Sequence, residues 1–115
     1  MEIFKWLDDK SLVAAYTIND FRELSESYYL NLEIRFKDDS ILYVKEFIEP
    51  TRRKYAFHWQ KKTGELIVRW DNAPHFPQLS TFPHHKHFGN GSVEESTDIS
   101  IEDVLMYIQK ALKTY

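Results

Sequence analysis

The stretch YLNLEIRFKDDSILYVKEFI, residues 29–48, decides the fold of this chain. Through Tyr29–Lys37, apolar side chains alternate with polar ones, which is the pattern of a strand buried on one face only. The residues Asp38-Asp39-Ser40 come next and are typical of a tight turn. Ile41–Ile48 alternates again, with Leu42, Val44 and Ile48 on one side. We therefore expect an antiparallel hairpin with one face toward a core.

A second hairpin is predicted after Pro50, with Lys61-Lys62-Thr63-Gly64 as its turn. A four-residue loop would set the register so that cross-strand pairs of large side chains stabilise the sheet. The expected pairs are Trp59 with Leu66, Phe57 with Val68, and Tyr55 with Trp70. The two tryptophans could stack on nucleobases, but this pattern assigns them to the core.

The opposite face of this hairpin is the more informative one for function. The same register places His58, Arg69 and Asp71 together there. A slip of one residue would move every side chain to the other face, so the grouping depends on the register.

The end of the chain predicts a helix over Ile101–Leu112. Ser100 is a natural N-cap and Asp103 completes a capping box. The apolar residues fall on one narrow stripe, and Lys110 and Lys113 complement the helix dipole.

The remaining N-terminal residues give weaker patterns. Met1–Lys10 has Ile3, Phe4 and Leu7 at helical spacing, and Ser11–Ile18 alternates as a strand does. Asn19–Ser27 fits a loop or a short helix. The expected fold is a single α+β domain over residues 1–115. Its antiparallel sheet has about five strands, including the two hairpins, and is packed by the C-terminal helix and a short N-terminal one.

Residues 73–92 predict an irregular segment. Pro74, Pro77, Pro83 and the triplet Gly89-Asn90-Gly91 argue against regular structure. A loop of about 20 residues inside a small domain is most often functional or disordered. Its large apolar side chains suggest that it is held against the body of the protein; they are Phe76, Leu79, Phe82, Phe88 and Val93.

Composition limits the class of protein. The chain has 115 residues, 43% of them hydrophobic and 16% aromatic, which is too apolar for a disordered chain. Without cysteine, disulfides and thiolate metal sites are excluded, and a reducing cytoplasm is the simplest location. No run of about 18 apolar residues predicts a membrane span, and the first residues lack the pattern of a signal peptide.

Charge is distributed unevenly along the chain. Residues 1–50 carry 6 basic and 11 acidic side chains, whereas residues 51–91 carry 7 basic and 2 acidic ones. The positive block also contains all five histidines, from His58 to His87. A basic, imidazole-rich surface would suit a phosphate-bearing ligand.

Four of the histidines lie in PHFPQLSTFPHHKH, residues 74–87, and their type suggests two kinds of chemistry. Imidazole is the commonest metal ligand in proteins, so His75, His85 and His87, with His84 or Asp71 nearby, could hold zinc or manganese. No helical H-x-x-x-H spacing is present, and we do not favour a metal cofactor.

The alternative is metal-free phosphodiester chemistry. Internal transfer in RNA needs a base for the 2′-hydroxyl, an acid for the leaving oxygen and a fixed cation for the phosphate. Histidine can fill both proton-transfer roles near neutral pH. Arg69 would supply the cation and Asp71 would orient a histidine.

One long, compositionally unusual signature resembles the TumE family of small toxin proteins. It comprises Tyr55-x-x-His58-Trp59-Gln60, then Arg69-Trp70-Asp71-Asn72-Ala73-Pro74-His75, then Phe82-Pro83-His84-His85-x-His87. The resemblance covers most of the chain; relatives more often show Asp-Gly at the turn of residues 38–40. It implies a toxin of a type II toxin–antitoxin pair that acts on RNA, encoded beside a helix-turn-helix antitoxin. It does not by itself assign catalytic residues.

The sequence therefore predicts a toxin-like ribonuclease with His85 and His87 as the acid–base pair, Arg69 as phosphate clamp and Asp71 as orienter. The full catalytic set is His58, Arg69, Asp71, His75, His84, His85 and His87, with Lys54, Lys86 and Asn72 as substrate-binding residues. The expected partners are the antitoxin, RNA and a second copy in a homodimer. A non-catalytic module that binds nucleic acid or protein, and a metal-dependent hydrolase, are the alternatives.

Overall fold

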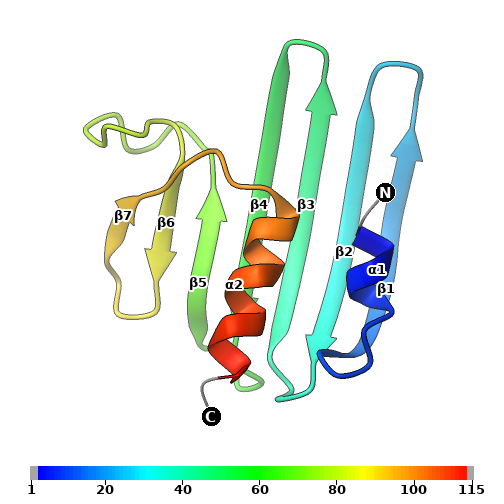
Figure 1. Ribbon diagram of the computed structural model, residues 1–115. Coiled ribbons are helices and arrows are strands. Elements are labelled where there is room, and N and C mark those ends of the chain that lie inside the picture. Colours follow the sequence, from blue (N-terminus) through cyan, green and yellow to red (C-terminus); the bar gives the residue numbers. More distant parts are fainter. Residues whose placement is uncertain (1–2, 114–115) are drawn as a thin grey trace.

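The computed structural model describes residues 3–113, which form one antiparallel sheet with two helices on the same face (Figure 1). Each strand pairs with its neighbours in sequence, in the order β1 to β7. The elements are α1 (Ile3–Leu7), β1 (Val13–Glu23), β2 (Tyr28–Phe36), β3 (Ile41–Glu49), β4 (Arg52–Gln60), β5 (Leu66–Asp71), β6 (His85–Phe88), β7 (Val93–Glu95) and α2 (Ile101–Lys113). The expected α+β class is confirmed, but the sheet has seven strands where about five were predicted. The expected helix within Met1–Lys10 is α1; its first two residues lie outside the described part.

The first predicted hairpin is confirmed as β2 and β3, with Leu32 opposite Val44 and Ile34 opposite Leu42. The Asp38 carboxylate accepts a hydrogen bond from the Ser40 backbone N–H at 3.0 Å, which closes the turn. All four apolar side chains of these pairs are almost completely buried. Alternation in the sequence therefore identified the core face of these two strands correctly.

One position of β3 departs from that alternation. Ile48, which the sequence groups with the buried side chains, is 38% exposed, whereas Glu46 on the same face is 8% exposed. Glu46 is buried because Arg53 of β4 donates two hydrogen bonds to it, at 3.0 and 2.7 Å. Arg53 also donates to Asp98 and to the Ile99 carbonyl, so it ties the segment before α2 to the sheet.

Of the two unpredicted strands, β6 lies within the segment expected to be irregular, residues 73–92, and β7 directly follows that segment. Strand β6 has four residues and β7 three, too few for a local pattern to reveal. They form because β6 adds to the edge of β5 and β7 adds to β6. At the other end, β1 continues to Glu23, through most of the segment left ambiguous from sequence.

The register of β4 and β5 differs from the predicted one. Phe57 lies opposite Trp70 and Trp59 opposite Val68, a shift of two positions, with an irregularity between Trp59 and Gln60. A bulge inserts one extra residue into a strand, and the length of the connecting loop does not predict it. Because the shift is even, the side chains of Val68–Asp71 keep their predicted faces, and Trp59 and Trp70 are in the core, at 4% and 3% exposure. The bulge changes the residues before it: Leu66, expected in the core opposite Trp59, pairs with Gln60, and Ile67 packs against the core instead.

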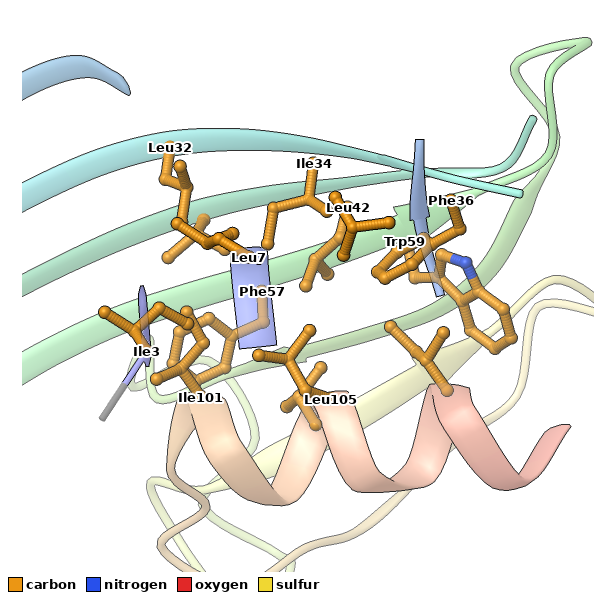
Figure 2. Packing of buried hydrophobic residues seen from close by; sticks show 14 of the residues in the cluster. Ile3, Leu7, Leu32, Ile34, Phe36, Leu42, Phe57, Trp59, Ile101 and Leu105 are labelled. Atoms are coloured by element: carbon orange, nitrogen blue, oxygen red, sulfur yellow. The ribbon is translucent and has the colours of Figure 1, made fainter. Parts of the chain in front are cut away.

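Helix α2 covers the central strands and completes the core (Figure 2). Ile101 and Leu105 point from α2 toward the buried side chains of the sheet. The predicted cap is confirmed, since the Asp103 N–H donates to the Ser100 hydroxyl while the Asp103 carboxylate accepts from the Ser100 N–H. The helix therefore begins where the sequence indicates.

We expect Leu105→Ala to lower the free energy of unfolding by about 2–5 kcal/mol, because Leu105 is fully buried and alanine would leave a cavity. The matched control is Met106→Ala, one position along the same helix, where the side chain is 46% exposed and the loss should be far smaller. Urea denaturation of both variants measures the difference. Equal losses would contradict the observed orientation of α2.

Both described helices lie on one face of the sheet, and they leave the other face uncovered by helices (Figure 1). We call the side without helices the open face; within residues 3–113 no helix lies on it (Figure 1). Neither of the two described helices is long and apolar enough to cross a membrane.

Candidate functional site

The open face carries a row of three polar side chains that runs directly across β4, β5 and β6. His58 of β4 lies opposite Arg69 of β5, and Arg69 lies opposite His87 of β6. Side chains of directly paired residues stand on the same face and close together. The next row along the strands brings Asp71 of β5 opposite His85 of β6. Five of the seven predicted catalytic residues therefore converge.

Asp71 is the centre of this cluster. Its carboxylate is 6% exposed and accepts hydrogen bonds from the Ala73 N–H at 3.0 Å and from Arg69 Nε at 3.1 Å. The His85 Nε2 atom lies 2.9 Å from Oδ1, and His87 Nε2 lies 3.7 Å from Oδ2. The hydrogen bond from Arg69 can fix the orientation of the guanidinium, whereas the two imidazoles are close enough to Asp71 for electrostatic interaction.

His85 is the most enclosed member of the cluster, at 1% exposure. Its Nδ1 lies 3.0 Å from the Pro83 carbonyl oxygen, which can only accept, so Nδ1 carries a proton. Its Nε2 is close to Asp71 but outside hydrogen-bond geometry, so that contact is electrostatic rather than a directed bond. The Phe76 ring packs edge-on against the imidazole with centroids 4.8 Å apart. His85 is therefore enclosed by the protein, and it interacts with neighbouring residues rather than with solvent.

His87 is accessible and its pKa is lowered. Its side chain is 27% exposed. Burial lowers the pKa of His87 most; the charge of Asp71 opposes this, and electrostatic interactions with His85 and Arg69 lower the pKa further. His87 is thus neutral near pH 7 and able to accept a proton.

His58 has a similar environment on the other side of Arg69. An Arg69 Nη1 hydrogen is directed toward Nδ1 of His58 at 3.3 Å. Burial, followed by the charge of Arg69, lowers the pKa of His58. Two imidazoles with lowered pKa values therefore flank one guanidinium.

A model of the family described as Toxin TumE matches residues 3–112 of this chain. The chain belongs to the TumE toxin family. The matched range includes the whole cluster, and membership in a toxin family implies an antitoxin partner. Comparison with curated proteins and with solved structures found no match.

Two of the histidines in the TumE signature lie away from the cluster. His84 contacts the helix side of the sheet, where the Tyr55 hydroxyl lies 2.9 Å from its Nδ1 and the rings stack. Burial raises the pKa of Tyr55 to about 12, so this hydroxyl keeps its proton near neutral pH and can donate it to His84. His75 lies in the exposed part of the connection between β5 and β6. The predicted set of seven thus divides, and within residues 3–113 no side-chain hydrogen bond, ion pair or ring contact joins His84 or His75 to the other five.

The predicted substrate-binding residues of this TumE family member also separate. Lys54 lies on the open face, on the same side of β4 as His58. Lys86 lies opposite Trp70 and therefore points to the helix side, where its Nζ is 5.5 Å from the centre of the Phe88 ring. Asn72 uses its side chain structurally, accepting from the Tyr55 N–H and donating to the Arg53 carbonyl.

Sequence reasoning missed two residues that extend the cluster. Tyr43 of β3 lies opposite His58, with ring centroids 6.2 Å apart, and Lys45 lies opposite Ala56 in the next row. The alternation of β3 already placed both on the polar face. The signal that would have joined them to the site was the pairing of the two hairpins with each other.

A metal ion in this TumE site would have to use Asp71, His85 and His87, whose ligand atoms lie within 4.8 Å of one another. The sequence-based choice of His75 does not fit, because His75 is not in this group. The Arg69 guanidinium occupies one Asp71 oxygen, which places a fixed positive charge where a cation would have to bind. The donor set is therefore a poor fit for a resident metal.

Proposed function

We propose that this TumE family member is a ribonuclease toxin that cleaves RNA without a metal. The observation that carries the proposal is the row of His58, Arg69 and His87 across three strands, backed by the buried Asp71. Two imidazoles on either side of one guanidinium match the needs of phosphoryl transfer within RNA, namely a base, an acid and a fixed cation.

In the proposed reaction, His87 takes the proton of the 2′-hydroxyl, and the oxygen bonds to the adjacent phosphorus. Arg69 pairs with the non-bridging oxygens as negative charge builds on them. The bond from phosphorus to the 5′-oxygen breaks, and His58 gives a proton to that oxygen. The products are a 2′,3′-cyclic phosphate and a 5′-hydroxyl end.

His85 has a different role here from the proton transfer predicted from sequence. At 1% exposure it does not touch a substrate, so we assign it as a positioning residue that acts through Asp71. Asp71 orients His87 and favours the imidazolium that forms when His87 accepts a proton.

The direct test is incubation of purified protein with a labelled RNA, followed by analysis of the ends produced. We expect 2′,3′-cyclic phosphate ends, and we expect dialysis against EDTA to leave the rate unchanged. Loss of activity with EDTA and its return with one metal would instead support the metal-dependent hydrolase. Binding of RNA without cleavage would support the non-catalytic module.

The pKa directions predict an acidic optimum. The base must be neutral and the acid protonated, so kcat/KM should be bell-shaped in pH. Because the pKa values of His87 and His58 both lie below the ordinary value of 6.5, both limbs move to lower pH. We expect a maximum on the acidic side of pH 6.5, measured with free enzyme at low RNA concentration. A maximum above pH 7 would contradict the assigned pair.

The partner assignments are proposals of the same kind. We infer that the antitoxin is a helix-turn-helix protein, that both act in the cytoplasm where the RNA is, and that the toxin can form a homodimer. Co-expression with the neighbouring open reading frame should rescue growth. Light scattering of the purified toxin would show whether it is dimeric.

A further inference from the structure

We propose that a hollow on the open face, next to the histidine row, is a subsite for one nucleotide of single-stranded RNA. The inference rests on the proposed function, because it names the form of the RNA substrate at the same site. It adds residues of β2 and β3 to a site otherwise built from β4 to β6.

The hollow has a volume of about 320 Å³, at the small end of the range for ligand pockets. Its lining on the open face is Tyr29, Lys45, Phe47, Lys54, Ala56 and Arg69. It exists because Ala56, between Lys45 and Asp71 in its row, has almost no side chain to fill the space. Arg69 belongs both to the hollow and to the histidine row, so the two are continuous.

Three cations surround the hollow. Among the residues that the structure describes, no carboxylate forms an ion pair with Lys45 or Lys54, whereas Arg69 is held by Asp71. Both lysines are exposed. Unpaired ammonium groups on an otherwise acidic chain attract a polyanion, and these two lie on the neighbouring strands β3 and β4.

Aromatic rings supply the second part of the recognition. Tyr29 and Phe47 lie opposite each other on β2 and β3, with ring centroids 6.4 Å apart and planes tilted by 56°. Both rings are only half-buried although they stand on the face without helices. Exposed rings beside cations bind single strands, because an unstacked base can lie on a ring while its phosphate meets a lysine.

A duplex would not use this arrangement. Its bases are already stacked on one another, so their faces are not available to Tyr29 or Phe47.

The path of the RNA across the open face is limited on one side, because Glu33 of β2 lies opposite Tyr43 and would repel a phosphate there. The strand of RNA should therefore run from the hollow past Arg69 toward His87.

The test uses a 2′-O-methyl oligonucleotide of about 12 nucleotides, within the site sizes of single-strand binders. It lacks the 2′-hydroxyl, so binding is measured without cleavage, by fluorescence anisotropy. A hairpin of the same length is the duplex probe. We expect tight binding of the single strand only.

Three variants test the hollow itself. Tyr29→Ser with Phe47→Ser should weaken binding about tenfold or more. Ala56→Leu should weaken it by filling the space, with every charge and ring retained. Lys45→Ala with Lys54→Ala should reduce the slope of log affinity against log salt by about 1.4, at roughly 0.7 for each phosphate contact. Lys61→Ala with Lys62→Ala makes the same charge change at the β4–β5 turn and should leave the slope unchanged.

The outcomes separate this proposal from the proposed function. Suppose that the protein cleaves RNA but binds the hairpin as well as the single strand, or that the Tyr29→Ser/Phe47→Ser and Ala56→Leu variants bind as the unaltered protein does. Either result would overturn the subsite and leave the proposed ribonuclease activity standing. Loss of binding in these variants of a protein that cleaves no RNA would support the subsite and remove the ribonuclease. Circular dichroism of each variant shows that the fold is retained.

Discussion

Replacing His87 with alanine should lower kcat/KM for RNA cleavage by about 10² to 10⁴-fold, the usual contribution of one general acid or base. His87 is a partly accessible imidazole of the cluster, at 27% exposure, and it stands next to both Arg69 and Asp71. The loss should appear in kcat rather than in RNA affinity, because the imidazole moves a proton and does not grip the phosphate. Single-turnover cleavage together with binding of the 2′-O-methyl oligonucleotide separates the two effects.

The matched control is His75→Ala, which removes the same group from the exposed connection between β5 and β6. Activity should stay close to that of the unaltered protein. If His75→Ala abolished cleavage while His87→Ala did not, the row of His58, Arg69 and His87 would not be the site.

The second large effect is expected for Arg69→Met. Removing the guanidinium takes away the cation that we propose to face the reacting phosphate, and loss of one such group typically lowers kcat by about 10² to 10³-fold. Arg69 also lowers the pKa values of His58 and His87. The residual activity should therefore have its optimum at a higher pH than the unaltered protein has. A pH series of kcat/KM measures both effects.

Arg35→Met provides the comparison for this variant. Arg35 is also on the open face, but on β2, where its side chain is 53% exposed and lies 3.9 Å from Asp39. Neither the rate nor the pH optimum should change. A lowered rate in Arg69→Met with an unshifted pH optimum would mean that Arg69 holds the fold or the RNA but does not act on the histidines.

The alternation of side chains was enough to predict which residues share a face. His58, Arg69 and Asp71 were grouped correctly although the predicted register was two positions off. A strand repeats every two residues, so an even error leaves the faces intact. The α2 helix was equally predictable, because its cap and its apolar stripe are local features of the sequence.

The position of the remaining histidines could not be predicted in the same way. His84 and His85 are adjacent in sequence, yet one contacts Tyr55 on the helix side and the other contacts Asp71 on the open face. What separates them is the start of β6 at His85, and that strand exists only because the edge of β5 is free to pair with it. Such pairing depends on the three-dimensional arrangement of distant residues, which local patterns do not contain.

The position of α2 after all seven strands in the sequence has a consequence during synthesis. Trp59 and Trp70 pack against Tyr107 of this helix, so the sheet that holds the histidine row lacks its cover until α2 has been made. A polypeptide still being translated therefore has an incomplete core and an unsteady site.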